Sequence, residues 1–253
     1  MIPKRIIPLF LLSHGRLMKG TNFRDYVDVG DPISQAMIYD AQGADEIIIV
    51  DIDATKESRH ISTDVIEAMI TKCRLPISAG GGIRSVQDAT ECFKAGADKI
   101  VLNTAAVLNP PLVRKLAKEF GSQSVVVSID VKKGANGSYA IYTDSGKQKH
   151  TISLPEYITN TVSAGAGEIM ITSIDHEGTL SGFDDSLYRN LRKQVPVSFI
   201  ASGGAGCYDD IVRLFRGSDC DACALGKMLF LRDYDIVRIK SYLTGRHIVT
   251  RDA

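Results

Sequence analysis

The sequence predicts one α/β domain, a single (β/α)8 TIM barrel with a twofold internal half-barrel repeat. Two observations predict it. Short apolar runs alternate with helical patterns along all 253 residues, without a change of composition that would mark a linker. The glycine-rich stretch 76–85 recurs at 197–206, so that Gly81 and Gly82 correspond to Gly203 and Gly204. We therefore expect one domain, residues 1–253, made of half-barrels at about 1–122 and 123–253.

Each expected element follows from its local pattern. The run 6–12, IIPLFLL, is continuously apolar, as in a strand buried on both faces. Similar runs predict the other strands, and the longer stretches between them predict helices. The expected strands are 6–12, 46–51, 77–79, 99–103, 124–130, 168–173, 198–201 and 222–225. The expected helices are 31–41, 62–73, 86–95, 111–120, 154–164, 184–194, 209–215 and 235–243. The polar stretch 132–150 indicates a long excursion or a hairpin. A doubly wound open sheet is the alternative, but a twofold repeat of four units favours closure.

Composition excludes several classes of protein. The 30 basic and 30 acidic residues give a formal net charge of +0, which does not favour a partner such as nucleic acid or an anionic membrane. No apolar run reaches the ~18 residues of a membrane span, and the N-terminus lacks a signal-peptide pattern. The five cysteines are odd in number and scattered, which indicates a reducing, cytoplasmic setting. We expect no metal site and no cofactor.

In a barrel of this kind, side chains at the carboxyl ends of the strands carry the chemistry. Small, hydroxyl and glycine residues suit a phosphate cradle, and the helix after a glycine loop offers N–H groups to an anion. The two repeated loops would lie on opposite sides of the barrel mouth and fit a ligand with phosphates at both ends. Alternatively, these glycines only permit tight turns. The residues expected at this end are Asp51, Gly81, Gly82, Asn103, Thr104, Asp130, Thr172, Gly203, Gly204, Gly226 and Lys227.

Asp130 is the candidate acid–base group. It ends the otherwise mostly apolar strand SVVVSID, where burial would raise the pKa of its carboxyl. The alternative is a structural ion pair with Lys132 or Lys133.

Charged residues also occur where strands begin. Arg5, Glu46, Lys99 and Glu168 bring two cations and two anions to that end of the barrel. They could pair across the axis, as buried charges require. Position alone favours the alternative, a solvated set of outward rim charges, because the facing of a strand residue is not fixed by sequence.

These residues carry a resemblance to the cyclase subunits of imidazole glycerol phosphate synthase, over nearly the full length. The shared segments are KRII (4–7), KGTNF (19–23), GDP (30–32), QGADE (42–46), GGGIRS (80–85), GADK (96–99), NTAAV (103–107), TSID (172–175) and ASGGAG (201–206). The resemblance implies a class I glutaminase docked on the face where the strands begin, with ammonia passing through the barrel to a bis-phosphorylated substrate. It implies that Arg5, Glu46, Lys99 and Glu168 are the ammonia gate, which reverses the preference from position. It also places Asp98 at the glutaminase interface and Lys19, Glu177 and Gly178 among the phosphate- or substrate-binding residues.

The chain departs from that family at the catalytic end. The family ends its first strand with Cys-Leu-Asp-Val-Lys-Asp-Gly-Arg, whereas residues 9–16 here read LFLLSHGR. Leu11 therefore replaces the first catalytic aspartate, while Asp130 keeps the second. The Asp-Gly of the sixth loop becomes Glu177-Gly178, and the Ala-Ser after the last strand becomes Gly226-Lys227.

This combination is similar to the glycosyl amidation-associated branch of surface-polysaccharide biosynthesis. In that branch, the barrel and a glutaminase-like partner supply ammonia to a sugar amidotransferase that acts on an acetamido sugar. We expect that function. The alternatives are an authentic cyclase subunit of histidine biosynthesis with a rearranged site, and a non-catalytic scaffold that activates its glutaminase.

Overall fold

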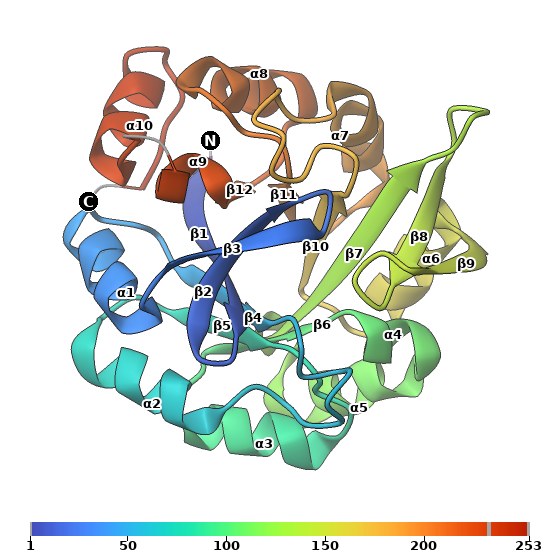
Figure 1. Cartoon of the computed structure of the whole chain (residues 1–253). Helices are drawn as coiled ribbons and strands as arrows, with labels where there is room; N and C mark the ends of the chain where they lie inside the picture. The colour runs from blue at the N-terminus through green and yellow to red at the C-terminus, as the bar shows by residue number, and fades with distance from the viewer. Residues whose placement is uncertain (1, 232–233, 252–253) are drawn as a thin grey trace.

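The computed structural model describes residues 2–231 and 234–251, and within them eight parallel strands close into a barrel (Figure 1). Their order is β10-β11-β12-β1-β4-β5-β6-β7, and β7 pairs with β10 to close the ring. The open-sheet alternative is therefore excluded, and the barrel prediction is confirmed. The barrel strands are β1 (Arg5–Ser13), β4 (Ile47–Asp51), β5 (Ile77–Gly80), β6 (Lys99–Leu102), β7 (Val125–Lys133), β10 (Glu168–Ser173), β11 (Ser198–Ser202) and β12 (Ala222–Leu225).

Helices surround the barrel (Figure 1). They are α1 (Pro32–Ala41), α2 (Thr63–Lys72), α3 (Val86–Lys94), α4 (Thr104–Leu108), α5 (Pro111–Phe120), α6 (Leu154–Ser163), α7 (Asp185–Leu191), α8 (Tyr208–Ser218), α9 (Lys227–Leu231) and α10 (Ile236–Thr244), with 3-10 turns at Ser122–Ser124 and Arg192–Gln194. Side chains cap several N-termini: Asp31 accepts from the N–H of Ser34 at α1, and Ser85 and Asp88 form a capping box at α3. The short α4 and α9 were not expected.

Two antiparallel hairpins extend the sheet. One is β8 (Tyr139–Thr143) with β9 (Gln148–Ser153), which confirms the hairpin interpretation of the polar stretch after β7. The other is β2 (Arg16–Thr21) with β3 (Arg24–Gly30), which the sequence did not predict. Figure 1 shows it crossing in front of the barrel. Its strands carry many charged residues and its turn places Asn22 and Phe23 at positive φ, so the usual alternation is weak there.

Alternate residues of each barrel strand face inward. The inward residues form their own apolar cluster, drawn from strands alone: Ile7, Leu9, Ile48, Val101, Val126, Met170, Ile200, Ala222 and Ala224. A separate, larger cluster lies between the sheet and the helices. Because side chains alternate along a strand, Arg5, Ile7, Leu9 and Leu11 share the inner face of β1. One strand thus leads from a charge at its start, through apolar layers, to the mouth at its end.

No helix in residues 2–231 or 234–251 is both long enough and apolar enough to cross a lipid bilayer.

Candidate functional site

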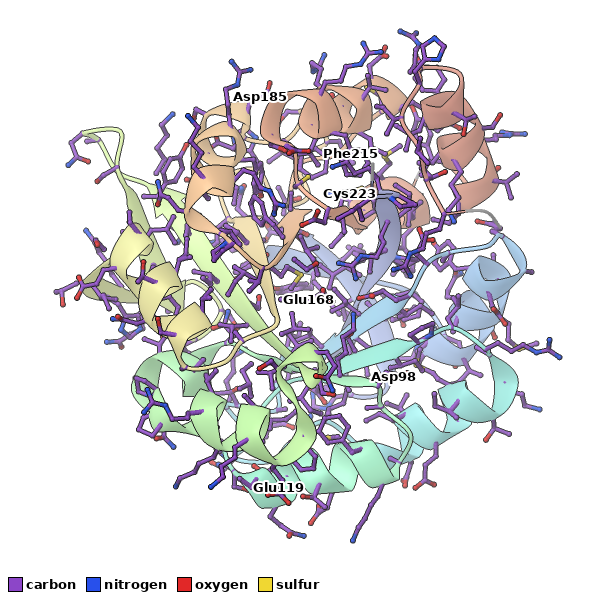
Figure 2. The ribbon with its side chains drawn as sticks, turned by 180° about the vertical axis from the view of Figure 1, so that it is seen from behind. Asp98, Glu119, Glu168, Asp185, Phe215 and Cys223 are labelled. Carbon is purple, nitrogen blue, oxygen red and sulfur yellow. The ribbon has the colours of Figure 1, made fainter. Side chains whose placement is uncertain are left out.

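Four charged side chains meet where the barrel strands begin. Arg5, Lys99 and Glu168 are the first residues of β1, β6 and β10, and Glu46 directly precedes β4. The guanidinium of Arg5 lies 2.8 Å from Glu46 Oε2 and 3.1 Å from Glu168 Oε2. Lys99 Nζ lies 2.9 Å and 2.7 Å from the same two carboxylates. Figure 2 shows Glu168 near the middle of this end of the barrel. Each cation pairs with both anions, so the four side chains form a charge ring.

Burial explains why the ring is fully paired. Arg5 is 6% exposed and Glu46 is 3% exposed, so the expectation of solvated rim charges from position alone is wrong: these positions face inward. Burial alone would lower the pKa of Arg5, but Glu168 and Glu46 outweigh it and hold that pKa above its usual value. Burial alone would raise the pKa of Glu168, but Arg5 and Lys99 outweigh it and hold that pKa low. The pairing therefore favours the charged forms of Arg5 and Glu168 despite their burial.

Ser198, the first residue of β11, adds a hydroxyl to this ring. Its Oγ accepts a hydrogen bond from Arg5 Nη2 at 2.7 Å. Arg5 is thus held by both carboxylates and by Ser198. In contrast, Glu46 Oε1 is buried without a hydrogen-bond partner among the described residues. Sequence reasoning missed Ser198, because a serine before an apolar run carries no signal of its own.

Asp98 lies next to Lys99 on the same end of the barrel and is exposed (Figure 2). Its Oδ2 accepts a hydrogen bond from the backbone N–H of Ile77 at 2.8 Å. Asp45 makes the matching contact with the N–H of Ile6 at 2.7 Å, but it is buried and paired with Lys240. Asp98 is therefore fixed to the start of β5 and remains exposed beside the charge ring.

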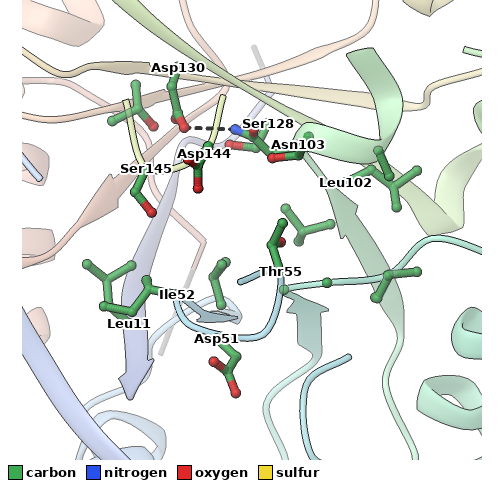
Figure 3. A pocket seen from close by; sticks show the side chains of 18 of the residues that line it. Leu11, Asp51, Ile52, Thr55, Leu102, Asn103, Ser128, Asp130, Asp144 and Ser145 are labelled. Atoms are coloured by element: carbon green, nitrogen blue, oxygen red, sulfur yellow. Dashed lines mark hydrogen bonds between the residues drawn. The ribbon is translucent and has the colours of Figure 1, made fainter. Parts of the chain in front are cut away.

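A cavity of about 400 Å³ opens at the other end of the barrel, where the strands end (Figure 3). Apolar side chains such as Leu9, Val101 and Met170 form much of its wall, so it reaches down to the inner apolar cluster. Figure 3 shows Leu11 and Asp130 on separate sides of it. Predicted residues that line the cavity are Leu11, Asp51, Gly81, Gly82, Asn103, Thr104, Asp130, Thr172 and Glu177.

Asp130, the predicted acid–base group, lines this cavity. Asn103 Nδ2 donates a hydrogen bond to Asp130 Oδ2 at 2.8 Å (Figure 3). Burial raises the pKa of Asp130 to about 7, against a smaller lowering by the Asn103 hydrogen bond and with a further raising contribution from Glu177. The ion-pair alternative is not formed: Lys132 Nζ donates to Gly146 O and Lys133 Nζ to Ser186 Oγ. Asp130 can therefore both give and take a proton near neutral pH.

Asp51, the last residue of β4, holds the loop that follows that strand. Its carboxylate accepts from Arg59 Nη1 at 2.5 Å and from the backbone N–H groups of Asp53 and Ala54, each at 3.0 Å. Its donors are thus all from the loop that follows β4. Arg59, eight residues downstream, was not identified from the sequence, because the pairing depends on how that loop folds back.

The loop after β5 needs glycine. Gly82 has a φ of +66°, and a Cβ there would lie 1.9 Å from the carbonyl oxygen of Arg59. The expectation that the next helix offers free N–H groups is wrong in part. Asp88 Oδ2 accepts from the N–H groups of Arg84 and Ser85, and Ser85 Oγ accepts from the N–H of Asp88, so one N–H in the first turn of α3 is already engaged. The side chains of Lys56 and Arg84 instead bring positive charge to the cavity wall.

The glycine-rich loop of the second half-barrel, which was expected at the barrel mouth, does not line this cavity in the described part of the chain. Lys19, Gly178, Gly203, Gly204, Gly226 and Lys227 are absent from the described lining. Lys227 Nζ donates to Thr21 Oγ1 of the β2–β3 hairpin at 2.7 Å. Lys19 is fully buried and its Nζ donates to the carbonyl of Leu9. Burial lowers the pKa of Lys19 to about 8, partly offset by Glu177.

Comparison with known proteins places this geometry in a family. The model of a family described as histidine biosynthesis protein matches residues 5–235. The chain belongs to that family. It is 40% identical over 251 residues to the imidazole glycerol phosphate synthase subunit HisF of Alkaliphilus metalliredigens, and 40% identical over 252 residues to that of Lactiplantibacillus plantarum. It is 39% identical over 251 residues to that of Bacillus cereus. Each alignment covers 99% of this chain and 100% of the relative.

Family membership sharpens the importance of Leu11. Leu11, two residues before the end of β1, lines the cavity with a side chain that cannot transfer a proton. Within the described part of the chain, no group of three or more His, Cys, Asp or Glu side chains gathers to hold a metal ion.

Proposed function

We propose that this chain is the barrel subunit of a glutamine amidotransferase complex, and that ammonia enters at the charge ring and is used at the cavity. The observation that carries the proposal is the inner face of β1. Arg5 begins it in the ring, Ile7 and Leu9 continue it in the apolar cluster, and Leu11 ends it at the cavity. The names of the three relatives, all subunits of a synthase, support a second subunit.

The charge ring suits the entry of neutral ammonia. A free ammonium ion would have to lose its water inside an apolar barrel without a counter-ion, which is costly. Ammonia can exchange hydrogen bonds with the ring and then cross the inner cluster as a small neutral molecule. Arg5 is held by an additional hydroxyl, from Ser198, so Lys99 is the cation whose movement opens the ring. Asp98, exposed beside Lys99, belongs to the docking face for the class I glutaminase.

The second step of the proposal concerns the molecule that accepts the ammonia. Of the two positions that carry catalytic aspartates in the resembled family, only Asp130 keeps a carboxyl, because the other is Leu11, so a reaction that needs proton transfer at both is poorly served. We therefore propose that this barrel delivers ammonia onward, and that a sugar amidotransferase uses it on an acetamido sugar. The second candidate is cyclisation in histidine biosynthesis. The names of all three relatives favour this second candidate.

Reconstitution tests the proposal. The chain is mixed with the class I glutaminase encoded nearest to it, and complex formation and glutamine hydrolysis are measured. We expect a complex that Asp98→Lys weakens and that Asp64→Lys, an exposed aspartate at the start of α2, leaves intact. Failure to form any complex contradicts the proposed partner. Stimulated hydrolysis without transfer of ammonia to either acceptor supports a scaffold instead.

A further inference from the structure

A second, smaller cavity of about 100 Å³ lies outside the barrel. Its walls come from α4, the beginning of α5, β9 and α6, which Figure 1 shows together at one side of the barrel. Ala106, Val107 and Val113 give it apolar walls, and Asn160 is exposed at its edge. In the described part of the chain, none of its lining residues carries a charge or also lines the larger cavity at the barrel mouth. The two cavities are therefore separate spaces.

One polar group in the wall of the smaller cavity has no partner. Tyr157, on α6, lines this cavity and is 4% exposed. Its hydroxyl is buried without a hydrogen-bond partner among the described residues. Burial raises the pKa of Tyr157, so the hydroxyl keeps its proton; the nearby Thr161 opposes that rise but makes no hydrogen bond with Tyr157. Because an unpaired buried hydroxyl is costly, a ligand that offers it an acceptor gains from filling the cavity.

The size and the walls of the smaller cavity define the class of ligand. An apolar cavity of about 150 Å³ in another protein holds benzene, so a cavity of about 100 Å³ with an exposed edge suits a molecule of that size or smaller. The Tyr157 hydroxyl adds a requirement for an oxygen that accepts a hydrogen bond. A charged molecule is disfavoured, because the described walls offer no opposite charge.

The short helix α4 is a wall shared by the two cavities. Thr104 and Leu108 line the larger cavity, whereas Ala106, between them, lines the smaller one. Asn103, the residue before α4, donates the 2.8 Å hydrogen bond to Asp130. A ligand on the far side of α4 therefore presses on the helix that positions Asn103 beside Asp130.

We infer that the smaller cavity is a second ligand site, for an uncharged, largely apolar molecule of about benzene's size with one hydrogen-bond-accepting oxygen, and that its occupancy shifts α4 and, with it, Asn103. Such a ligand regulates the larger cavity from outside the barrel. The inference goes beyond the proposed function, because it holds whichever molecule accepts the ammonia.

Phenol and toluene are suitable probes, because they share a ring and only phenol carries an oxygen. Each is added to the full chain up to about 10 mM, above the millimolar Kd expected of so small a ligand, and the amide signals are followed by nitrogen-15 NMR. We expect phenol to shift the signals of Ala106, Val107 and the Asn103 side-chain amide. Tyr157→Phe should weaken phenol binding about fivefold, through the lost hydrogen bond, and leave toluene binding unchanged. Tyr242→Phe, which removes a hydroxyl on α10, is the control and should change neither affinity.

Crystals soaked in phenol give the second measurement, with the phenol oxygen expected within hydrogen-bond distance of Tyr157 Oη. Phenol bound only in the larger cavity overturns the inference, as does an ordered water on Tyr157 that phenol does not displace. Equal phenol affinity in wild type and Tyr157→Phe overturns the role of the hydroxyl. Val107→Phe adds bulk inside the smaller cavity and should abolish the shift of the Asn103 signal. Persistence of that shift in Val107→Phe, or its absence in the wild type when the site is filled, overturns the link through α4.

Discussion

Asn103 Nδ2 donates a 2.8 Å hydrogen bond to Asp130 Oδ2, across neighbouring strands at the mouth of the barrel. This bond lowers the pKa of a carboxyl that burial raises to about 7. Replacing Asn103 with alanine should therefore raise the pKa of Asp130 further. Titration of the Asp130 carboxyl followed by carbon-13 NMR checks this shift. An unchanged or lower pKa of Asp130 in Asn103→Ala would contradict the claim that the hydrogen bond lowers it.

The same carboxyl predicts a pH dependence of stability. Its pKa is about 7 in the folded chain and about 3.9 when unfolded. The stability it contributes is thus fully present below about pH 4 and is lost as the pH rises through 7. Relative to Asp130→Asn, which does not titrate, the wild type should lose up to a few kcal/mol between about pH 4 and 8, at ~1.4 kcal/mol per tenfold change. Urea unfolding across this range measures it, and a constant difference would contradict the buried site.

Lys99→Ala removes one cation from the charge ring. Glu46, which is 3% exposed, and Glu168 would then have Arg5 as the one cation left in the ring. Breaking a buried ion pair by removing one partner typically costs about 3–5 kcal/mol, and the partial exposure of Lys99 places this change at or below the lower end. We expect less glutamine-dependent transfer with free ammonia still used. Activity assays with either nitrogen source check this, with exposed Lys115→Ala as the control. An equal fall in both activities would contradict the gate.

Gly82→Ala tests the glycine loop that follows β5. The φ of +66° disfavours any side chain there, and the new Cβ would meet Arg59 O at 1.9 Å. We expect a loss of about 1–3 kcal/mol of stability and weaker phosphate binding, because the loop must move. Gly137→Ala is the control, since it has a similar φ of +79° but open space around it. Equal stability losses in the two variants would show that backbone strain alone acts.

Repeats and apolar runs were enough to predict the barrel, because each buried strand must be apolar on both faces. The ends of the strands, and hence Asp130 and the ring residues, followed from strand order. The direction in which each strand residue faces did not, which is why position alone favoured a solvated rim for Arg5 and Glu46. The roles of Arg59 and Ser198, and the β2–β3 hairpin, depend on contacts that no local sequence pattern predicts.

Leu11 lines the cavity near the end of β1 with a side chain that cannot transfer a proton, so we expect cyclisation to be slow. The decisive measurement is imidazole formation from the phosphorylated cyclase substrate with saturating ammonium at alkaline pH, for wild type and Leu11→Asp. A positioned acid or base contributes roughly 10²–10⁴-fold, so wild-type turnover should be lower than that of an ordinary family member by about that factor. Leu11→Asp should recover part of it. Wild-type turnover at the level of ordinary family members would contradict the claim and assign the chain to histidine biosynthesis.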